Sequence, residues 1–94
     1  MATKQTDTVT DDELIARYIA PHPAKAGADQ AVLAGYGVSV WALVGYLRGT
    51  NASLQRVAAD YDLPVEAVDA AMAYYRRHKA IIDSRIAVND AAFA

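Results

Sequence analysis

The feature that most constrains this chain is a pair of helical patterns joined by a very short turn, in the sequence SLQRVAADYDLPVEAVDAAMAYYRRH at residues 53–78. Two helices that cross after so short a turn need a small residue at the crossing, which Ala58 supplies, and a turn residue that tolerates left-handed geometry, which Asp62 supplies. Apolar side chains at helical spacing can fill the space between the helices: Val57, Tyr61, Leu63, Val68 and Ala71. The stretch therefore predicts a helix-turn-helix within a core of three helices.

The exposed start of the second helix carries unsuitable chemistry for reading DNA. In a helix-turn-helix protein this segment presents Arg, Lys, Gln, Asn or Ser to base edges and phosphates. Here the corresponding residues are Pro64, Val65, Glu66, Asp69 and Ala70. The carboxylates of Glu66 and Asp69 would repel the phosphates of DNA. The single positive charge of Arg56 in the preceding helix compensates for little of this repulsion. The element is therefore predicted to be a scaffold rather than a DNA reader.

An additional helix is predicted near the N-terminus. Thr10 and Glu13 have the spacing of a capping box, in which each side chain bonds the backbone amide of the other residue. The helix is expected to cover residues 10–20, because the Pro-His-Pro sequence at 21–23 disfavours helical geometry and removes a donor. A loop is expected to follow over residues 21–30.

A short β piece and a further helix are predicted next. Residues 31–40 combine small apolar segments with Gly35 and Gly37, a pattern that favours a brief extended segment or ribbon bending at the glycines. The residues leave open whether 21–40 pair within the chain or across a dimer. Ser39 is then expected to cap a helix that ends at Gly49.

The C-terminal third predicts one long helix. Ser53 caps the first helix of the motif, and Pro64 occupies the first position of the second. No Gly or Pro follows it, and only good or tolerable helix formers occur until about Val88, so a single helix is expected over that whole distance. The predicted fold class is mainly α. The domain organisation is expected to comprise a disordered N-terminal tail at 1–9, a single helical domain at 10–88 and a C-terminal tail at 89–94.

Composition limits the classes of function. The chain has 94 residues, enough for one small domain, and a net charge of −2, which gives no general attraction to phosphate. It has no cysteine, which excludes disulfides, thiol catalysis and cysteine-based zinc sites and is typical of a cytoplasmic protein. The acidic N-terminal sequence does not resemble a signal peptide. The most apolar run, at 31–47, is interrupted by glycines and is shorter than the roughly 20 residues that span a bilayer, so no membrane span is expected.

No catalytic arrangement stands out in the sequence. His22 and His78 have no metal-ligand spacing around them, and Ser39, Ser53 and Ser84 lack a nucleophile motif. The chain is therefore predicted not to be an enzyme and to need no metal or cofactor.

The long helix carries more apolar surface than a small core can cover. Val68, Met72 and Tyr75 are expected in the core, whereas the apolar residues beyond them are predicted to pack against another chain: Ile81, Ile82, Ile86, Val88 and Phe93. Tyr74 begins a second stripe that repeats every seven residues. A basic cluster lies beside these residues and includes Arg76, Arg77, His78 and Lys79. It has three interpretations: a solvated helix face, salt bridges to a partner, or contacts to a DNA backbone.

From about Val32 to Ile86 the sequence resembles the family called domain of unknown function 433. The resemblance is carried by Ala-Gly-Tyr-Gly-Val-Ser-Val-Trp at 34–41, by Tyr-Leu at 46–47, by Val-Ala-Ala-Asp-Tyr-Asp-Leu-Pro at 57–64, by Glu-Ala-Val at 66–68, by Ala-Tyr-Tyr at 73–75 and by Ile-Asp at 82–83. The likeness implies a homeodomain-like helical domain preceded by a short β piece. It also implies an antitoxin that is encoded beside a PIN-like ribonuclease toxin, inhibits that toxin, forms a homodimer and regulates its own operon.

The resulting hypothesis is a type II antitoxin whose C-terminal helix and tail, residues 74–93, bind the toxin. The expected partner-binding residues are Tyr74, Arg77, Ile81, Ile82, Arg85, Ile86 and Phe93. One of four basic side chains, Arg76, Arg77, Lys79 or Arg85, would pair with carboxylates of the toxin's metal site, and the sequence does not choose among them. The alternative is a helix-turn-helix transcriptional regulator that contacts DNA through Arg56, Arg76, Arg77 and Lys79. A dimerisation module without a toxin is a third possibility.

Overall fold

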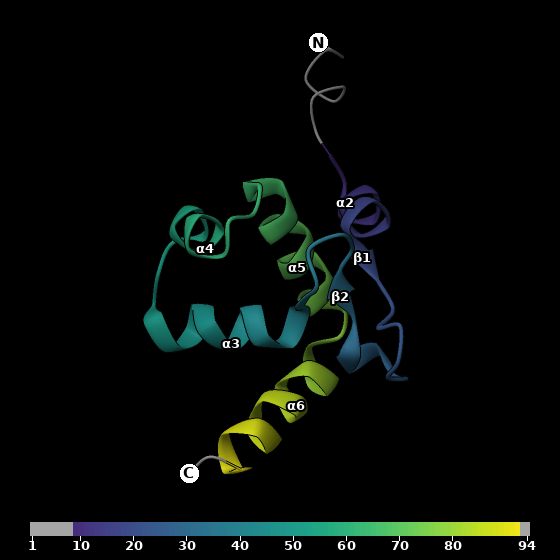
Figure 1. The fold of residues 1–94 in the computed structure, drawn as a ribbon, viewed down its shortest axis with the longest axis vertical. Helices are drawn as coiled ribbons and strands as arrows, with labels where there is room; N and C mark the ends of the chain where they lie inside the picture. The colour runs from purple at the N-terminus through teal and green to yellow at the C-terminus, as the bar shows by residue number, and fades with distance from the viewer. Residues whose placement is uncertain (1–8, 93–94) are drawn as a thin grey trace.

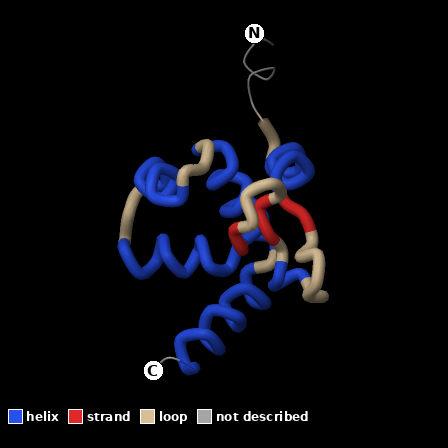
Figure 2. Tube along the Cα trace, in the orientation of Figure 1, coloured by secondary structure: helices blue, strands red, loops and turns tan. Residues whose placement is uncertain are grey.

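The computed structural model describes residues 9–92 and is mainly helical, with a small three-stranded antiparallel sheet (Figures 1 and 2). This confirms the predicted fold class. The elements in chain order are α2 (Asp11–Tyr18), β1 (Ile19–Ala20), the 3-10 helix η1 (Ala28–Gln30), β2 (Val32–Leu33), β3 (Val38–Ser39), α3 (Val40–Thr50), α4 (Leu54–Tyr61), α5 (Val65–Arg77) and α6 (Lys79–Ala92).

The N-terminal helix begins where the sequence predicts and ends earlier. The capping box is confirmed, because the Glu13 amide donates to Thr10 Oγ1 at 3.1 Å and the Thr10 amide donates to Glu13 Oε1 at 2.9 Å. The helix was expected to reach residue 20, but it ends at Tyr18 and the chain becomes extended at Ile19. The reason is sheet pairing, which gives the backbone of residues 19 and 20 partners outside the helix: Ile19 lies opposite Leu33 and Ala20 opposite Val32.

The β segments pair within the chain. β2 and β3 form an antiparallel hairpin in which Val32 lies opposite Ser39 and Leu33 opposite Val38. The turn between them needs backbone angles that side chains oppose, and it obtains them from Gly35 (φ +83°) and Gly37 (φ +70°). The predicted bend at these two glycines is therefore correct.

The core of three helices consists of α3, α4 and α5. The predicted turn is confirmed between α4 and α5, where Asp62 is left-handed (φ 57°) and the Leu63 amide donates to the carbonyl of Ala58 at 2.8 Å. The expected end of α3 at Gly49 is wrong. The helix continues to Thr50, and Asn51 (φ 53°) takes the left-handed position, because asparagine also tolerates that geometry.

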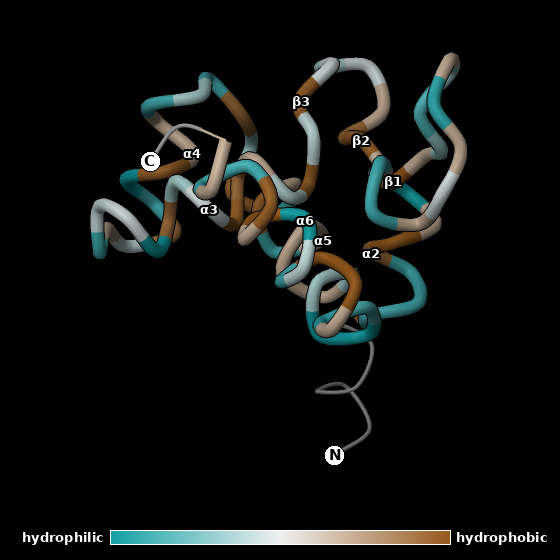
Figure 3. Tube along the Cα trace, turned by 90° about the horizontal axis from the view of Figure 1, so that it is seen from below, coloured by the Kyte–Doolittle hydropathy of each residue, from teal (hydrophilic) through white to brown (hydrophobic). Residues whose placement is uncertain are grey.

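The capping predictions around these helices have mixed outcomes. Ser53 caps α4 by accepting from the Arg56 amide, as expected. Ser39 precedes α3 but its hydroxyl makes no capping bond. The hydrophobic core contains side chains from most of the helices and strands. Hydrophobic segments accordingly occur along much of the chain (Figure 3). Its largest fully buried side chains are Leu33, Leu43, Ile82, Val40, Val44, Val57 and Val68.

The long C-terminal helix predicted from Pro64 to about Val88 is two helices. α5 ends at Arg77, His78 leaves helical geometry (φ −125°, ψ 34°), and α6 starts in a new direction (Figure 1). The His78 amide still bonds the carbonyls of Tyr74 and Tyr75, and its own carbonyl accepts from Ile82, so the break leaves these backbone groups paired. The new direction returns Ile82 and Ile86 to the core, where both are buried. α6 also continues to Ala92, so the tail expected from residue 89 is helical as far as the structure describes it.

Across residues 9–92, the structure contains no helix of the length and apolar character that crossing a bilayer requires.

Two glycines within α3 yield a stability prediction. Gly45 and Gly49 do not have positive φ, and a Cβ added at either would meet no described atom within 4 Å. Glycine inside a helix is less favourable than alanine by about 1 kcal/mol, so Gly45→Ala or Gly49→Ala is expected to raise the free energy of unfolding by up to that amount. Urea denaturation of each variant measures the change. A loss of stability would mean that something in the folded chain needs the space beside α3.

Candidate partner-binding surface

The second helix of the helix-turn-helix is covered by α2. Glu66, near the start of α5, accepts a hydrogen bond from the Tyr18 hydroxyl at 2.8 Å and from Arg17 Nη1 at 3.1 Å. At the other end of α5, Arg76 Nη2 lies 3.2 Å from both carboxylate oxygens of Asp11, and Arg77 pairs with Asp12. The two helices therefore run antiparallel and are joined by polar contacts at both ends.

Small residues allow the two helices to approach closely. Glu66, Ala70, Ala73 and Arg77 share one face of α5, because they are three or four residues apart. Ala70 and Ala73 are fully buried between the two polar ends, and Leu14 of α2 is buried as well. The prediction that Ala70 lies on an exposed face is wrong, since α2 covers it. Because α2 covers it, this face of α5 cannot enter a groove of DNA.

The basic residues assigned to DNA in the alternative hypothesis are all engaged with carboxylates of the chain. Arg76 and Arg77 bond α2, as described above. Arg56 Nε lies 3.1 Å from Asp60, and Lys79 Nζ lies 2.8 Å from Asp83. Each pair is solvent-accessible and contributes little stability, but a phosphate would have to compete with a carboxylate at every one of the four positions.

Arg85 differs from these four residues. Within the part of the chain that the structure describes it forms no ion pair, and its Nε is buried without a hydrogen-bond partner. Its guanidinium lies over the ring of Trp41, 5.5 Å from the ring centre. The Nη donors of a guanidinium suit a carboxylate, so Arg85 has these donors, although not the buried Nε, to offer a second molecule.

The apolar residues of α6 separate into two sets. Ile82 is 0% exposed and Ile86 is 6% exposed, so the prediction that these two contact a partner is wrong, because the kink at His78 turns them into the chain's own core. Ile81 is 43% exposed and Val88 is 60% exposed. Positions 81, 85 and 88 lie on one side of a helix, so Ile81, Arg85 and Val88 form a continuous strip, called here the α6 flank. Phe93 lies outside the described residues.

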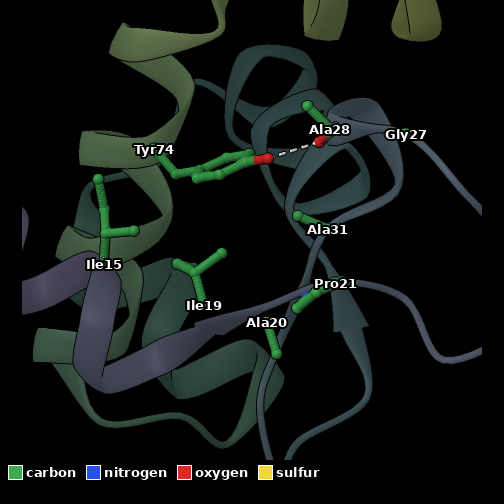
Figure 4. A pocket seen from close by; sticks show the side chains of 8 residues that line it. All are labelled: Ile15, Ile19, Ala20, Pro21, Gly27, Ala28, Ala31 and Tyr74. Atoms are coloured by element: carbon green, nitrogen blue, oxygen red, sulfur yellow. Dashed lines mark hydrogen bonds between the residues drawn. The ribbon is translucent and has the colours of Figure 1, made fainter.

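Tyr74 of α5 lines a mainly apolar pocket of about 380 Å³, whose other lining residues include Ile15 of α2 and Ile19 of β1. Figure 4 shows its ring beside Ile15 and Ile19, and its hydroxyl donates to the carbonyl of Ala28 at 2.8 Å. Burial raises the pKa of this hydroxyl. The ring also stacks on His78, with 4.3 Å between centroids. Tyr74 is therefore half-buried and held in place at the edge of this pocket.

The direction of α6 is fixed by a polar cluster around Asp83. The Tyr75 hydroxyl donates to Asp83 Oδ1 at 2.7 Å, and Arg48 bonds both the Tyr75 hydroxyl at 2.7 Å and the Asp83 carboxylate. Lys79 bonds the second carboxylate oxygen. The cluster connects α3, α5 and α6 and therefore holds the α6 flank at a defined angle. Its only local sequence signal is the spacing of Lys79 and Asp83, four residues apart on one helix.

Acid is expected to weaken this cluster. The hydrogen bonds from Lys79 and Tyr75, with a smaller contribution from Arg48, lower the pKa of Asp83 from 3.8 to about 2. A carboxyl whose pKa is lower in the folded state stabilises the fold above its unfolded value, and this stability is lost as pH falls through the folded value. The free energy of unfolding is therefore expected to fall as the pH is lowered from about 4 to about 2. In the Asp83→Asn variant, which has no carboxyl group at this position, the fall is expected to be smaller. Urea unfolding at a series of pH values tests this, and equal slopes for both proteins would contradict it.

The comparisons with known proteins give one finding. A family model described as "Protein of unknown function (DUF433)" matches residues 27–75. No curated protein and no solved structure matches the chain. The matched segment includes η1, the hairpin, α3, α4 and most of α5, and it ends before the α6 flank.

Proposed function

Because the chain belongs to the DUF433 family of proteins of unknown function, we propose that it is a cytoplasmic antitoxin of a type II toxin–antitoxin pair, which binds and inhibits a PIN-like ribonuclease. The resemblance suggests this class of partner. In this proposal the chain acts by binding and catalyses no reaction. A homodimer, which the resemblance also implies, is part of the proposal.

The α6 flank is the observation that supports protein binding most directly. Its two apolar residues are among the most exposed large hydrophobic residues of the described chain, and they lie on either side of an arginine that forms no ion pair with a described residue. Interfaces between proteins are enriched in arginine and use a few buried apolar anchors for most of their affinity. Ile81 and Val88 would be the anchors, and the pocket beside Tyr74 of α5 would receive a further apolar group of the partner.

Arg85 is the strongest candidate for the contact that inhibits the ribonuclease. Of the four basic residues considered from sequence, Arg76, Arg77 and Lys79 are engaged by carboxylates of the chain itself. An arginine that reaches the acidic site of a metal-dependent nuclease would pair with its carboxylates and compete with the metal. Desolvation by the flanking apolar groups would strengthen that pair.

The proposal is tested by co-expressing the chain with the protein encoded by its neighbouring gene. We expect a stable complex, and we expect the ribonuclease activity of the partner to be lost in the complex and restored on dissociation. A truncation at residue 80 is unsuitable as a probe, because it removes Ile82 and Ile86 from the core. If the chain alone shifts its own promoter DNA at about 150 mM salt and forms no complex with the neighbouring protein, the transcriptional alternative is correct.

A further inference from the structure

The N-terminal part of the described chain is docked on the rest as a unit. This unit, called here the arm, is residues 10–20 and comprises α2 and β1; residues 28–92 are called the body. The arm contacts α5 through the ion pairs described above and β2 through antiparallel pairing. Its helix is capped by its own Thr10 and Glu13, so the cap does not depend on the body. The arm also precedes the segment that the family model matches.

The face of α5 beneath the arm has a charge pattern that selects its occupant. Glu66 lies at one end of this face and Arg76 and Arg77 at the other, with Ala70 and Ala73 fully buried between them. An antiparallel helix that fits this face needs an acidic first turn and a basic last turn, and the arm has both. Release of the arm would expose the two alanines to water, so it is favourable only if an equivalent arm takes its place.

The loop that connects the arm to the body, residues 21–27 and called here the hinge, does little to hold them together. It forms no helix or strand, and all of its residues except His22 are exposed. Its side-chain hydrogen bonds stay within it, because His22 Nδ1 accepts from the amides of Ala24 and Lys25 at 2.9 Å and 3.0 Å. Its two prolines favour extended geometry at the residues before them. Seven extended residues span roughly 23 Å, so a straightened hinge can carry the arm to an adjacent copy at the cost of few contacts.

We propose that the chain forms a dimer in which two copies exchange their arms. The helix of each arm lies on α5 of the other copy, and its strand pairs with β2 of the other copy in the register seen within one chain. Exchange keeps every contact between arm and body, because the two copies are identical, and it is therefore a low-cost route to a dimer. This inference rests on the homodimer of the proposed function and does not require the ribonuclease.

Arm exchange makes the pocket beside Tyr74 a site that two chains share. Ile15 and Ile19 belong to the arm, whereas Ala31 and Tyr74 belong to the body (Figure 4). In the exchanged dimer each pocket takes the two isoleucines from one copy and the tyrosine from the other. A chain whose arm is displaced therefore lacks the complete pocket.

Cross-linking of the full chain tests the inference. The chain has no cysteine, so Asp12→Cys with Arg77→Cys introduces its only two thiols, at positions that are ion-paired between arm and body. A short bifunctional thiol reagent is added at a concentration where sedimentation shows a dimer. Exchanged arms give a covalent dimer on a denaturing gel, whereas arms kept in their own chain give a covalent monomer. The matched control, Arg56→Cys with Asp60→Cys, has its ion pair within α4 and should give only monomer. A covalent dimer in the first variant and none in the control supports the inference, and any other result overturns it. A natural chain that stays monomeric up to about 1 mM also overturns it.

Charge reversal gives a second test that uses no cysteine. Asp11→Lys with Asp12→Lys makes the arm basic, and Arg76→Glu with Arg77→Glu makes its contact on the body acidic. Each variant alone brings like charges together, so each is expected to dimerise about 10-fold more weakly than the natural chain, or worse. An equimolar mixture is expected to restore a dimer with one copy of each, because exchange then brings opposite charges together at both contacts. Native mass spectrometry identifies this heterodimer.

Two results of the mixing experiment would overturn arm exchange: no heterodimer in the mixture, or single variants that dimerise as tightly as the natural chain. The second result would place the dimer contact on another surface. Absence of a complex with the neighbouring gene's protein would refute the proposed ribonuclease partner, and it would leave both tests of the arm unaffected.

Discussion

Replacement of Ile82 by alanine is expected to lower the free energy of unfolding by about 2–5 kcal/mol, because it removes three carbons from a fully buried position and leaves a cavity. The neighbouring change Ile81→Ala is expected to cost much less, about 0.5 kcal/mol, since that residue is 43% exposed and lies outside the buried core. The two residues are adjacent and chemically identical, so helix propensity cannot explain a difference between them. Urea denaturation monitored by circular dichroism measures both values.

The loss in Ile82→Ala is a large fraction of the total stability of a small domain, which is roughly 5–15 kcal/mol. Where the alanine variant does not fold, Ile82→Val gives a graded test with an expected cost of about 0.5–1.5 kcal/mol. A result in which Ile81→Ala is the more damaging change would mean that the direction of α6 is wrong.

Local features of the fold could be predicted because each depends on residues close together in sequence. The capping box at Thr10, the left-handed Asp62 and the bend at Gly35 and Gly37 all follow from backbone chemistry within a few residues. The break at His78 could not be predicted in this way. No Gly or Pro marks it, and the fold gains from it only through distant contacts: burial of Ile82 and Ile86 and the bonds of Arg48 to Tyr75 and Asp83.

The difference between local and distant contacts also explains which parts of the predicted site are correct and which are wrong. Apolar spacing predicted correctly that some hydrophobic residues of this region stay exposed on the folded chain. Which residues they are depends on the direction of α6, which buries Ile82 and Ile86 and leaves Ile81 and Val88 exposed. Sequence alone treated Arg76, Arg77, Lys79 and Arg85 as equivalent. The structure distinguishes them through carboxylates that are 65 residues distant in one case, Asp11 beside Arg76, and four residues distant in another, Asp83 beside Lys79. The pairing of Arg76 with Asp11 has no signature in a single sequence, whereas the spacing of Lys79 and Asp83 on one helix does have one.

This distinction among the basic residues leads to the prediction with the largest expected effect on binding. Arg85→Glu is expected to weaken the complex with the ribonuclease by about 100-fold or more, because it places a carboxylate against the carboxylates that the arginine would have bonded. Ile81→Asp and Val88→Asp are each expected to weaken it by about 30-fold or more, since they charge the apolar anchors. Calorimetry and the ribonuclease assay measure these changes, and circular dichroism confirms that each variant is folded.

Arg76→Ala and Arg85→Ala form the matched comparison that decides the matter. Both remove one arginine from the C-terminal third of the chain, so a general loss of positive charge affects them equally. Arg76 is bonded by Asp11, and its removal is expected to leave affinity for the partner within about 3-fold of the natural value. Arg85→Ala is expected to reduce it by about 10-fold or more, and Arg85→Lys by less, because lysine keeps the charge but loses the planar pair of donors. Equal losses in Arg76→Ala and Arg85→Ala would show that the partner responds to net charge rather than to the α6 flank, and the assignment of Arg85 would then be incorrect.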